Sequence, residues 1–335
     1  MAPDLPLLPA AALLALPWAE APLPVAVIDL AREAAGSDGG ACALPPFPVI
    51  GLGTPDHPLA PRLDAVVPDH AEAALIVRNC TRNPQAAAVL VQLLRIVAAL
   101  PPTDALVAES LAYGLLQGGA EHRHWRAARG AAAPVPPGTV AVTRTGDTLA
   151  VVMDRPQALN AIDRAMRDAL REAFDIAALD PAVRRVTLEG RGRAFSVGAE
   201  LAEFGTTTDP LVAHAIRRQT LPAHALVRCA SRLEARVHGA CVGSGLEMAA
   251  FAATVLARPS AWFQLPELAM GLIPGAGGCV ALTHRIGRAL TARLVLSGRR
   301  MSAQTALDWG LVDRIVDGPD WAGTAQAAAS GVPTA

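Results

Sequence analysis

Two glutamates stand alone in strongly apolar runs, and they are the residues of this sequence best suited to proton transfer. Glu247 lies within residues 241–251 and Glu267 within residues 263–270, and neither run contains another charged residue. A single carboxylate in an apolar run is seldom buried without a partner or a task. A buried glutamate of this kind can act as a general acid or a general base. Each of the two is therefore a candidate for proton transfer, with a solvated edge position as the structural alternative.

Three glycine-rich segments accompany the glutamates, at residues 190–201, 237–248 and 263–278. Glycine lets the backbone turn at positive φ and lets a ligand approach the main chain closely. A helix that opens after such a turn presents free N–H groups with positive partial charge. These groups suit a developing oxyanion. Each segment taken alone would be read as a structural turn.

Two other glycine-rich motifs fit less well. The dinucleotide-binding fingerprint is poorly matched, because Met248 and Val280 stand where glycine or alanine belongs. Cys241 lies between two glycines at the spacing of a nucleophile elbow. A triad would need an acid and then a histidine on separate downstream loops, but Glu267 lies close before His284. A thiol hydrolase therefore remains a weaker rival.

The three segments, in this order and spacing, resemble the enoyl-CoA hydratase/isomerase (crotonase) superfamily. The resemblance covers roughly 180 residues, more than half of the chain. The matching stretches are an opening signature at 153–162, oxyanion-hole segments at 193–201, 237–248 and 266–278, and closing stretches at 287–298 and 303–312. The resemblance implies an α/β fold with a crotonase-like ββα spiral core.

The resemblance also implies roles for individual residues. The backbone N–H groups of Ala199 and Ser244 fall on the two oxyanion donors, although a simple helix cap is the alternative for Ser244. Glu247 and Glu267 fall on the hydratase carboxylates, which hold one water between them. Isomerases of the family need only the position of Glu267, so the presence of both favours an enoyl-CoA hydratase acting on a 2-enoyl-CoA thioester. The alternatives are another enolate reaction (isomerisation, decarboxylation or cofactor-free oxygenation) and a non-catalytic acyl-CoA-binding protein.

Coenzyme A is expected only as part of the substrate, with no metal and no other cofactor. Ala202 stands where the family often has a lysine that contacts CoA, so arginines are expected to meet the phosphates. The residues assigned to the CoA thioester are Arg155, Ala158, Arg193, Ala199, Gly243 and Gly275.

Composition narrows the other possibilities. The net charge of −1 offers no basic surface for nucleic acid or a membrane. All 29 cations are arginines, which excludes Schiff-base and P-loop lysines. Five scattered cysteines without a CxxC pair and a first cation at Arg32 favour a cytoplasmic protein without a secretory signal. The family resemblance implies a homo-oligomer, a trimer or hexamer.

Five segments are expected along the chain. They are a small α/β extension at 1–70, a helical segment at 71–129, a Pro/Ala linker at 130–137, the acyl-CoA core at 138–317 and a flexible tail at 318–335. Apolar residues at alternate positions predict strands, and apolar residues three or four positions apart predict helices. We expect strands at 25–30, 47–52 and 64–67, a short helix at 31–35, three helices within 71–116, a hairpin at 140–153, a helix at 163–178 and strands at 186–189, 235–237 and 254–257.

The helical segment carries one further hypothesis. Crotonases usually continue after the closing Gly-Leu-Val stretch with helices that cover the acyl pocket. Residues 83–91 and 109–125 look like those helices, but they precede the core. We therefore expect a permuted helical cap at 71–129, with an unrelated helical appendage as the alternative.

Overall fold

The computed structural model describes residues 5–13, 23–33, 44–130 and 135–317. The expected flexible tail at 318–335 and half of the expected linker lie outside these residues. None of the described helices is both long and apolar enough to cross a membrane.

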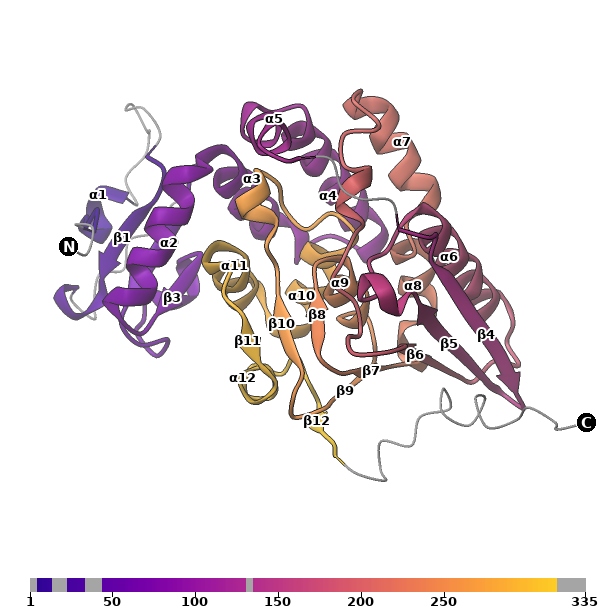
Figure 1. Cartoon of the computed structure of the whole chain (residues 1–335). Coiled ribbons are helices and arrows are strands. Elements are labelled where there is room, and N and C mark those ends of the chain that lie inside the picture. The colour runs from indigo at the N-terminus through magenta and orange to yellow at the C-terminus, as the bar shows by residue number, and fades with distance from the viewer. Residues whose placement is uncertain (1–4, 14–22, 34–43, 131–134, 318–335) are drawn as a thin grey trace, which may run out of the picture.

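A small three-stranded sheet begins the chain, as the sequence predicted. Its strands are β1 (Ala26–Asp29), β2 (Val49–Leu52) and β3 (Ala65–Val67), paired in parallel in the order β1-β2-β3. All four residues of β2 are buried, which explains its continuous apolar run. The described part of the expected helix at 31–35 is a single 3₁₀ turn, η1 (Leu30–Arg32). Helix α1 (Ala10–Leu13) lies beside this sheet (Figure 1).

Four helices follow, one more than the sequence indicated. They are α2 (His70–Arg82), α3 (Pro84–Val97), α4 (Pro102–Gln117) and α5 (Ala120–Ala127). Asp69 caps α2 by accepting a hydrogen bond from the N–H of Glu72, and prolines stand in the first turns of α3 and α4. Helix α5 lies within the helical segment predicted at 71–129, but no separate helix was predicted there because its sequence is mostly polar.

The remaining residues form an α/β core built on two sheets. The six-stranded sheet has the order β12-β9-β7-β6-β5-β4, and only the β4–β5 hairpin is antiparallel. A second sheet has the order β11-β10-β8. The strands are β4 (Thr139–Thr145), β5 (Thr148–Asp154), β6 (Arg185–Gly190), β7 (Leu233–Val237), β8 (Ala240–Val242), β9 (Thr254–Ala257), β10 (Trp262–Gln264), β11 (Met301–Ser302) and β12 (Arg314–Ile315).

Helices cover these sheets. The expected hairpin and the expected helix at 163–178 are confirmed, the latter as α6, whose buried face includes Met166, Leu170 and Phe174. The helices of the core are α6 (Arg164–Leu179), α7 (Pro210–Thr220), α8 (Ala223–Cys229), α9 (Ser244–Ala249), α10 (Gly278–Ile286), α11 (Arg288–Ser297) and α12 (Ala303–Asp308), with the 3₁₀ turns η3 (Pro156–Ala158), η4 (Leu201–Glu203) and η6 (Glu267–Met270).

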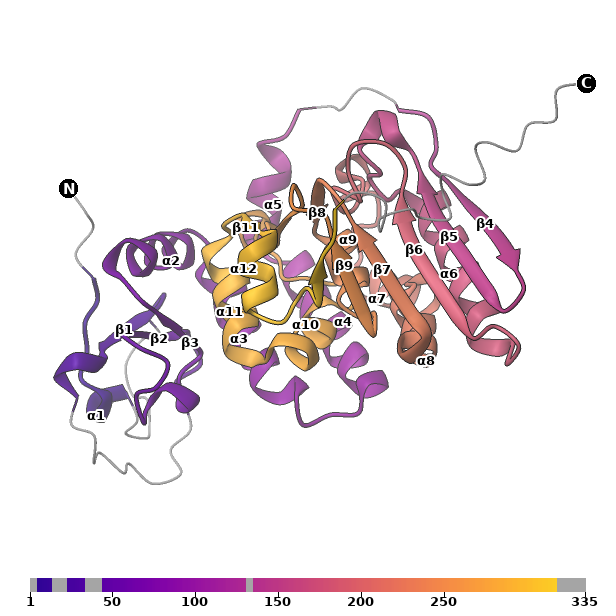
Figure 2. The same cartoon turned by 90° about the horizontal axis from the view of Figure 1, so that it is seen from below.

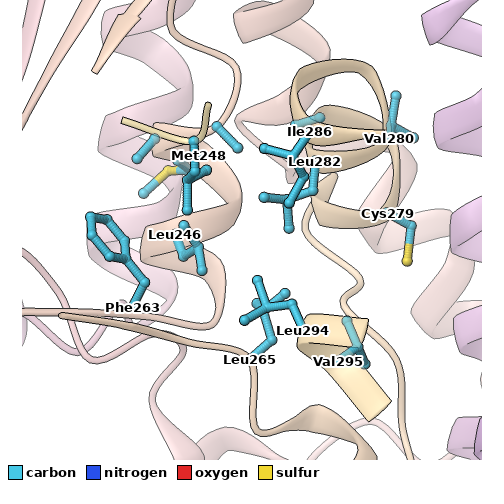
Figure 3. Packing of buried hydrophobic residues seen from close by; sticks show 14 of the residues in the cluster. Leu246, Met248, Phe263, Leu265, Cys279, Val280, Leu282, Ile286, Leu294 and Val295 are labelled. Atoms are coloured by element: carbon cyan, nitrogen blue, oxygen red, sulfur yellow. The ribbon is translucent and has the colours of Figure 1, made fainter. Parts of the chain in front are cut away.

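The N-terminal helices pack directly on the core. Helices α3 and α4 contact α10, α2 and α3 contact α11, and α5 contacts η6. Figure 2 shows the small sheet at one end of the molecule and β4 at the other, with α10–α12 between them. Figure 3 shows the shared apolar interior, where Leu246 and Met248 of α9 lie among side chains from β10, α10 and α11.

Candidate active site

A cavity of about 490 Å³ lies where the three glycine-rich segments meet the N-terminal helices. Its walls come from sequence-distant elements: α4 and α5, the turns after β5 and β6, α7, the start of α9, and the segment 266–276. The residues that line the cavity include Tyr113, His122, Ala199, Arg217, Gly243, Ser244, Glu247, Glu267 and Gly275.

Glu247 lies in the first turn of α9 and is only 2% exposed. Its Oε2 accepts hydrogen bonds from the N–H groups of Ala276 (2.7 Å) and Gly278 (2.8 Å). Among the described residues, its Oε1 has no partner. Burial raises the pKa of Glu247 to about 7, against the lowering effect of the two N–H bonds. One oxygen is thus fixed to the backbone while the carboxyl stays available for proton transfer near neutral pH.

Glu267 opens η6 and is also buried, but its surroundings differ. Its Oε2 is shielded and has no hydrogen-bond partner within the described part of the chain. Burial, and then the charge of Glu247, raise the pKa of Glu267 well above its usual range. A Cβ at Gly243, where φ is +51°, would stand 3.0 Å from Glu267 Oε1, so glycine keeps the space for this carboxyl. A shielded oxygen without a partner beside a cavity marks a place where a ligand or water binds.

Two free backbone donors lie close to the glutamates. The chain at Gly198 passes directly beside the start of α9, because a Cβ there would stand 3.3 Å from Gly243 Cα and 3.5 Å from Ser244 N. In the residues that the structure describes, the N–H groups of Ala199 and Ser244 donate to no acceptor. Ser244 is the first residue of α9, Gly243 is the N-cap, and Ser244 Oγ has no partner there. The side chain of Ser244 is therefore not the helix cap.

Asn160 holds the first glycine-rich segment in place, a role that the sequence did not reveal. It is fully buried with φ of +55°, a region that asparagine tolerates better than most residues. Its Nδ2 donates to the carbonyls of Arg191 (2.9 Å), Ala194 (2.9 Å) and Phe195 (3.1 Å). The only sequence signal was its place in the opening signature.

Three of the residues assigned to CoA lie away from the cavity. Arg155 is 3% exposed, and its guanidinium bonds to Glu200 (2.8 Å) and to the carbonyls of Ala161 and Pro136. A guanidinium so occupied has no free edge for a phosphate, so the assignment of Arg155 does not fit the structure. Ala158 and Arg193 do not line the cavity either, whereas Ala199, Gly243 and Gly275 do.

Helix α4 brings side chains to the site that the sequence analysis missed. The ring of Tyr113 fills the space above Gly275, where a Cβ would stand 2.1 Å from Tyr113 Cδ2. The guanidinium of Arg217 lies over this ring, 4.7 Å from its centroid. Burial raises the pKa of Tyr113, so its phenol is neutral. Glu109, one turn earlier, is a third buried carboxylate, and the reasoning used for Glu247 and Glu267 would have singled it out.

Helix α5 closes the cavity with an aromatic group. His122 stacks on Trp125 (5.4 Å between centroids) and lies near the ring of Phe204 (6.3 Å). Its Nδ1 donates to the carbonyl of Met270 at 3.0 Å, and burial lowers its pKa. The neutral imidazole of His122 and the ring of Phe204 thus form this wall, and Trp125 packs on His122.

Comparison with known proteins identifies the class to which this fold and site belong. The family model described as enoyl-CoA hydratase/isomerase matches residues 144–330. The chain is 35% identical to the mitochondrial enoyl-CoA hydratase of Pongo abelii, over 49% of this chain and 56% of the relative. It is 33% identical to the 2,3-dehydroadipyl-CoA hydratase of Escherichia coli K12, over 52% of this chain and 68% of the relative.

Solved structures agree with these relatives. DspI of Pseudomonas aeruginosa matches with a TM-score of 0.51 and 30% identity, over 60% of this chain and 77% of DspI. Enoyl-CoA hydratase subunit I of Geobacillus kaustophilus matches with a TM-score of 0.50 and 30% identity, over 57% and 74% of the two chains. The chain belongs to the enoyl-CoA hydratase/isomerase family, the crotonase superfamily. It spans a little more than half the length of the mitochondrial relative.

Proposed function

We propose that this protein is an enoyl-CoA hydratase that adds water across the double bond of a 2-enoyl-CoA thioester. The observation that supports this most is the placement of Glu247 and Glu267. They come from different segments, face one cavity and lie beside two backbone N–H groups that donate to no acceptor among the residues that the structure describes. The site has the parts that a thioester enolate and an attacking water require.

The unequal surroundings of the two glutamates suggest their roles. Glu247 accepts two N–H bonds, which favour its carboxylate form, and would take a proton from the attacking water. Glu267 Oε2 has no partner among the described residues, and Glu267 would hold the proton that it delivers to C2 of the acyl chain. The hydroxyl adds to C3 while the thioester oxygen gains charge and accepts from Ala199 N and Ser244 N. The product is a 3-hydroxyacyl-CoA.

Arginines at the cavity edge are candidates for the CoA phosphates in place of Arg155 and Arg193. Arg164 and Arg167 lie one turn apart on α6, and both line the cavity. Arg164 is exposed, so its guanidinium can reach a phosphate without losing a buried partner. Substituting either residue with glutamine should raise KM for acyl-CoA more than it lowers kcat.

We also propose that helices α2–α5 are the cap of this site, placed before the core instead of after it. The support is that α4 and α5 supply Tyr113, Gln117 and His122 to the cavity wall. A chain that begins at Gly138 should then lose solubility or activity. Full activity of such a chain would contradict the cap.

We also propose a cellular location and an oligomeric state for the enzyme. Cys80, Cys229, Cys241 and Cys279 are buried and unpaired, which suits the reducing cytoplasm. The proposed homo-oligomer, a trimer or hexamer, rests on the family resemblance. Sedimentation of the purified full chain tests it.

A thioester panel tests the proposed function. The full-length protein would be incubated with crotonyl-CoA, a 3-enoyl-CoA and saturated acyl-CoAs, with hydration, double-bond migration and oxygen uptake followed together. We expect 3-hydroxybutyryl-CoA from crotonyl-CoA. Migration of the 3-enoyl bond without hydration would assign an isomerase instead. Tight acyl-CoA binding without turnover of any thioester would assign a binding protein.

A further inference from the structure

A third buried carboxylate supports the active-site backbone from outside the core. Glu109 lies in the middle of α4 and is 1% exposed. Its Oε1 accepts from Gly277 N at 2.6 Å, and its Oε2 accepts from Cys279 N at 2.9 Å and Val280 N at 3.3 Å. All three donors belong to the glycine-rich turn and first residues of α10. A side chain 168 positions away in sequence thus anchors the loop of the third motif.

The bonds of Glu109 alternate with those of Glu247. Glu247 takes the N–H groups of residues 276 and 278, while Glu109 takes those of residues 277, 279 and 280. Five successive backbone N–H groups are therefore divided between two carboxylates. Glu247 belongs to α9, and Glu109 belongs to α4. Bonds to neighbouring residues keep the two carboxylates close, because successive Cα atoms are only about 3.8 Å apart. Glu109 therefore fixes the stretch of backbone whose N–H groups bind Glu247 Oε2.

The geometry favours an ionised Glu109. Both of its oxygens only accept, and a protonated carboxyl would need an acceptor for its O–H. Burial and then the charge of Glu247 raise the pKa of Glu109 well above its usual range, and the three N–H bonds oppose this only in part. When Glu109 is ionised, its charge makes the neighbouring carboxyl harder to ionise. The other groups that face Glu247 are Glu267 of η6, Tyr113 of α4 and Cys279 of α10, with the cation of Arg217 on α7 behind Tyr113.

We infer that Glu109 is a positioning residue for Glu247: it anchors the backbone N–H groups that orient this carboxyl. Because the two carboxylates bind neighbouring donors, an ionised Glu109 also strengthens the binding of a proton at Glu247. The inference rests on the proposed function, in which Glu247 takes a proton from water. It makes α4 part of the acid–base chemistry as well as part of the cavity wall. The orientation of Glu247 and its readiness to bind a proton thus depend on a helix that precedes the core.

Glu109→Gln tests the inference, because glutamine has nearly the same shape but no charge. We expect kcat for crotonyl-CoA to fall about 10- to 100-fold through misplacement of Glu247, with KM changed less than about threefold. The acid limb of the kcat/KM profile should move to lower pH by about one unit, since Glu247 loses a neighbouring negative charge. An acid limb that stays in place or moves to higher pH would overturn the inference, because loss of the anchor alone weakens the N–H bonds to Glu247 and so raises its pKa.

Glu121→Gln is the matched control. Glu121 accepts N–H bonds from Gln85 and Ala86 at the start of α3, so it has the same bonding chemistry but does not line the cavity. Its acid limb should coincide with that of the unsubstituted protein. A shift as large as that of Glu109→Gln would overturn the inference by showing that any such anchor has the effect.

Glu109→Asp separates charge from position and serves if Glu109→Gln does not fold. Aspartate keeps the charge but is one methylene too short to hold all three donors. We expect kcat to fall about tenfold with no shift of the acid limb to lower pH. An unchanged kcat would overturn the positioning role.

A titration without substrate separates this inference from the proposed function. Glutamate labelled with carbon-13 at the carboxyl reports protonation by NMR, and Glu247→Gln assigns the signal of Glu247. In Glu109→Gln the midpoint of that signal should fall, whether or not the protein hydrates crotonyl-CoA. An unchanged midpoint would overturn the inference. Lack of hydration by the unsubstituted protein would overturn only the proposed function.

Discussion

At the scale of single residues, two glutamates of the same type differ through their hydrogen bonds. Glu247 is tied to two backbone N–H groups, whereas Glu267 Oε2 is shielded without a partner among the described residues. Burial raises the pKa of both glutamates, and the two N–H bonds to Glu247 oppose that rise. In the proposed function, this difference makes Glu247 the base and Glu267 the acid.

The pH dependence of the reaction should report this pair. Burial raises the pKa of Glu247 to about 7, and a base acts only when it is deprotonated. We expect kcat/KM for crotonyl-CoA to fall as pH decreases through about 7, with an apparent midpoint that belongs to the coupled pair. Initial rates between pH 5 and pH 9 measure it, within the range in which the protein stays folded. A flat profile down to pH 5 would contradict the role of Glu247.

The oxyanion donors can be tested by proline at Ser244. Ser244 is the first residue of α9, a position that proline tolerates in helices. Ser244→Pro removes the N–H and places a ring carbon toward the thioester oxygen. We expect kcat to fall about 10²- to 10³-fold. Ser244→Ala, which keeps the N–H and removes an unpartnered Oγ, should stay near the original activity. Equal kcat in the two variants would contradict the proposed donor.

The sequence predicted the acidic residues of the site better than the basic ones. Glu247 and Glu267 stood out because an isolated carboxylate in an apolar run needs an explanation. Glu109 gave the same signal, but it lies before the linker, outside the stretch that the resemblance covered. Arg155 was misassigned because sequence alone does not show that protein acceptors occupy a guanidinium.

At the scale of elements, α4 contacts the third glycine-rich segment through Tyr113 as well as through Glu109. The ring of Tyr113 occupies the place where a side chain at Gly275 would be, and the guanidinium of Arg217 from α7 lies over this ring. Periodicity predicted α6 because it buries one apolar stripe. The pattern of α4 is weaker, since it buries Glu109 and Ser110 while Leu111 and Leu115 are exposed. Helix α5 is mostly polar and contacts η6, and it was predicted only as part of the helical segment at 71–129.

A double-mutant cycle tests this contact. Gly275→Ala should lower both stability and activity, because the new Cβ overlaps Tyr113 Cδ2. Tyr113→Ala creates space, so adding it to Gly275→Ala should recover part of the lost stability. We expect a coupling free energy of about 1–3 kcal/mol from urea unfolding of the four proteins. Additive effects would contradict the contact.

At the scale of the whole molecule, ion pairs connect the N-terminal sheet to the core. Asp64, 1% exposed, accepts from Val49 N and pairs with Arg95 of α3 and Arg288 of α11. Glu72 of α2 likewise holds Arg293 of α11 through two bonds of 2.7 and 2.8 Å. These pairs fix α2 and α3 against the helix that follows α10.

Asp64→Asn should therefore destabilise the protein. The substitution leaves two arginines without their shared carboxylate. Fully buried pairs lose about 3–5 kcal/mol when one partner is removed. Because Arg95 and Arg288 are 17% and 23% exposed, we expect a smaller loss of about 1–3 kcal/mol in the free energy of urea unfolding. Asp308→Asn, at an exposed position, should change it by less than about 0.5 kcal/mol. Equal stability of both variants would contradict the connection.

The central claim is that Glu247 and Glu267 act together on one water molecule. The most direct measurement is crotonyl-CoA hydration by the unsubstituted protein, Glu267→Gln and the Glu247→Gln/Glu267→Gln double variant, all checked for folding. We expect Glu267→Gln to lower kcat about 10²- to 10⁴-fold. The second substitution should add less than about tenfold, because groups that act as a unit are not additive. A double variant within tenfold of the unsubstituted kcat would contradict the account.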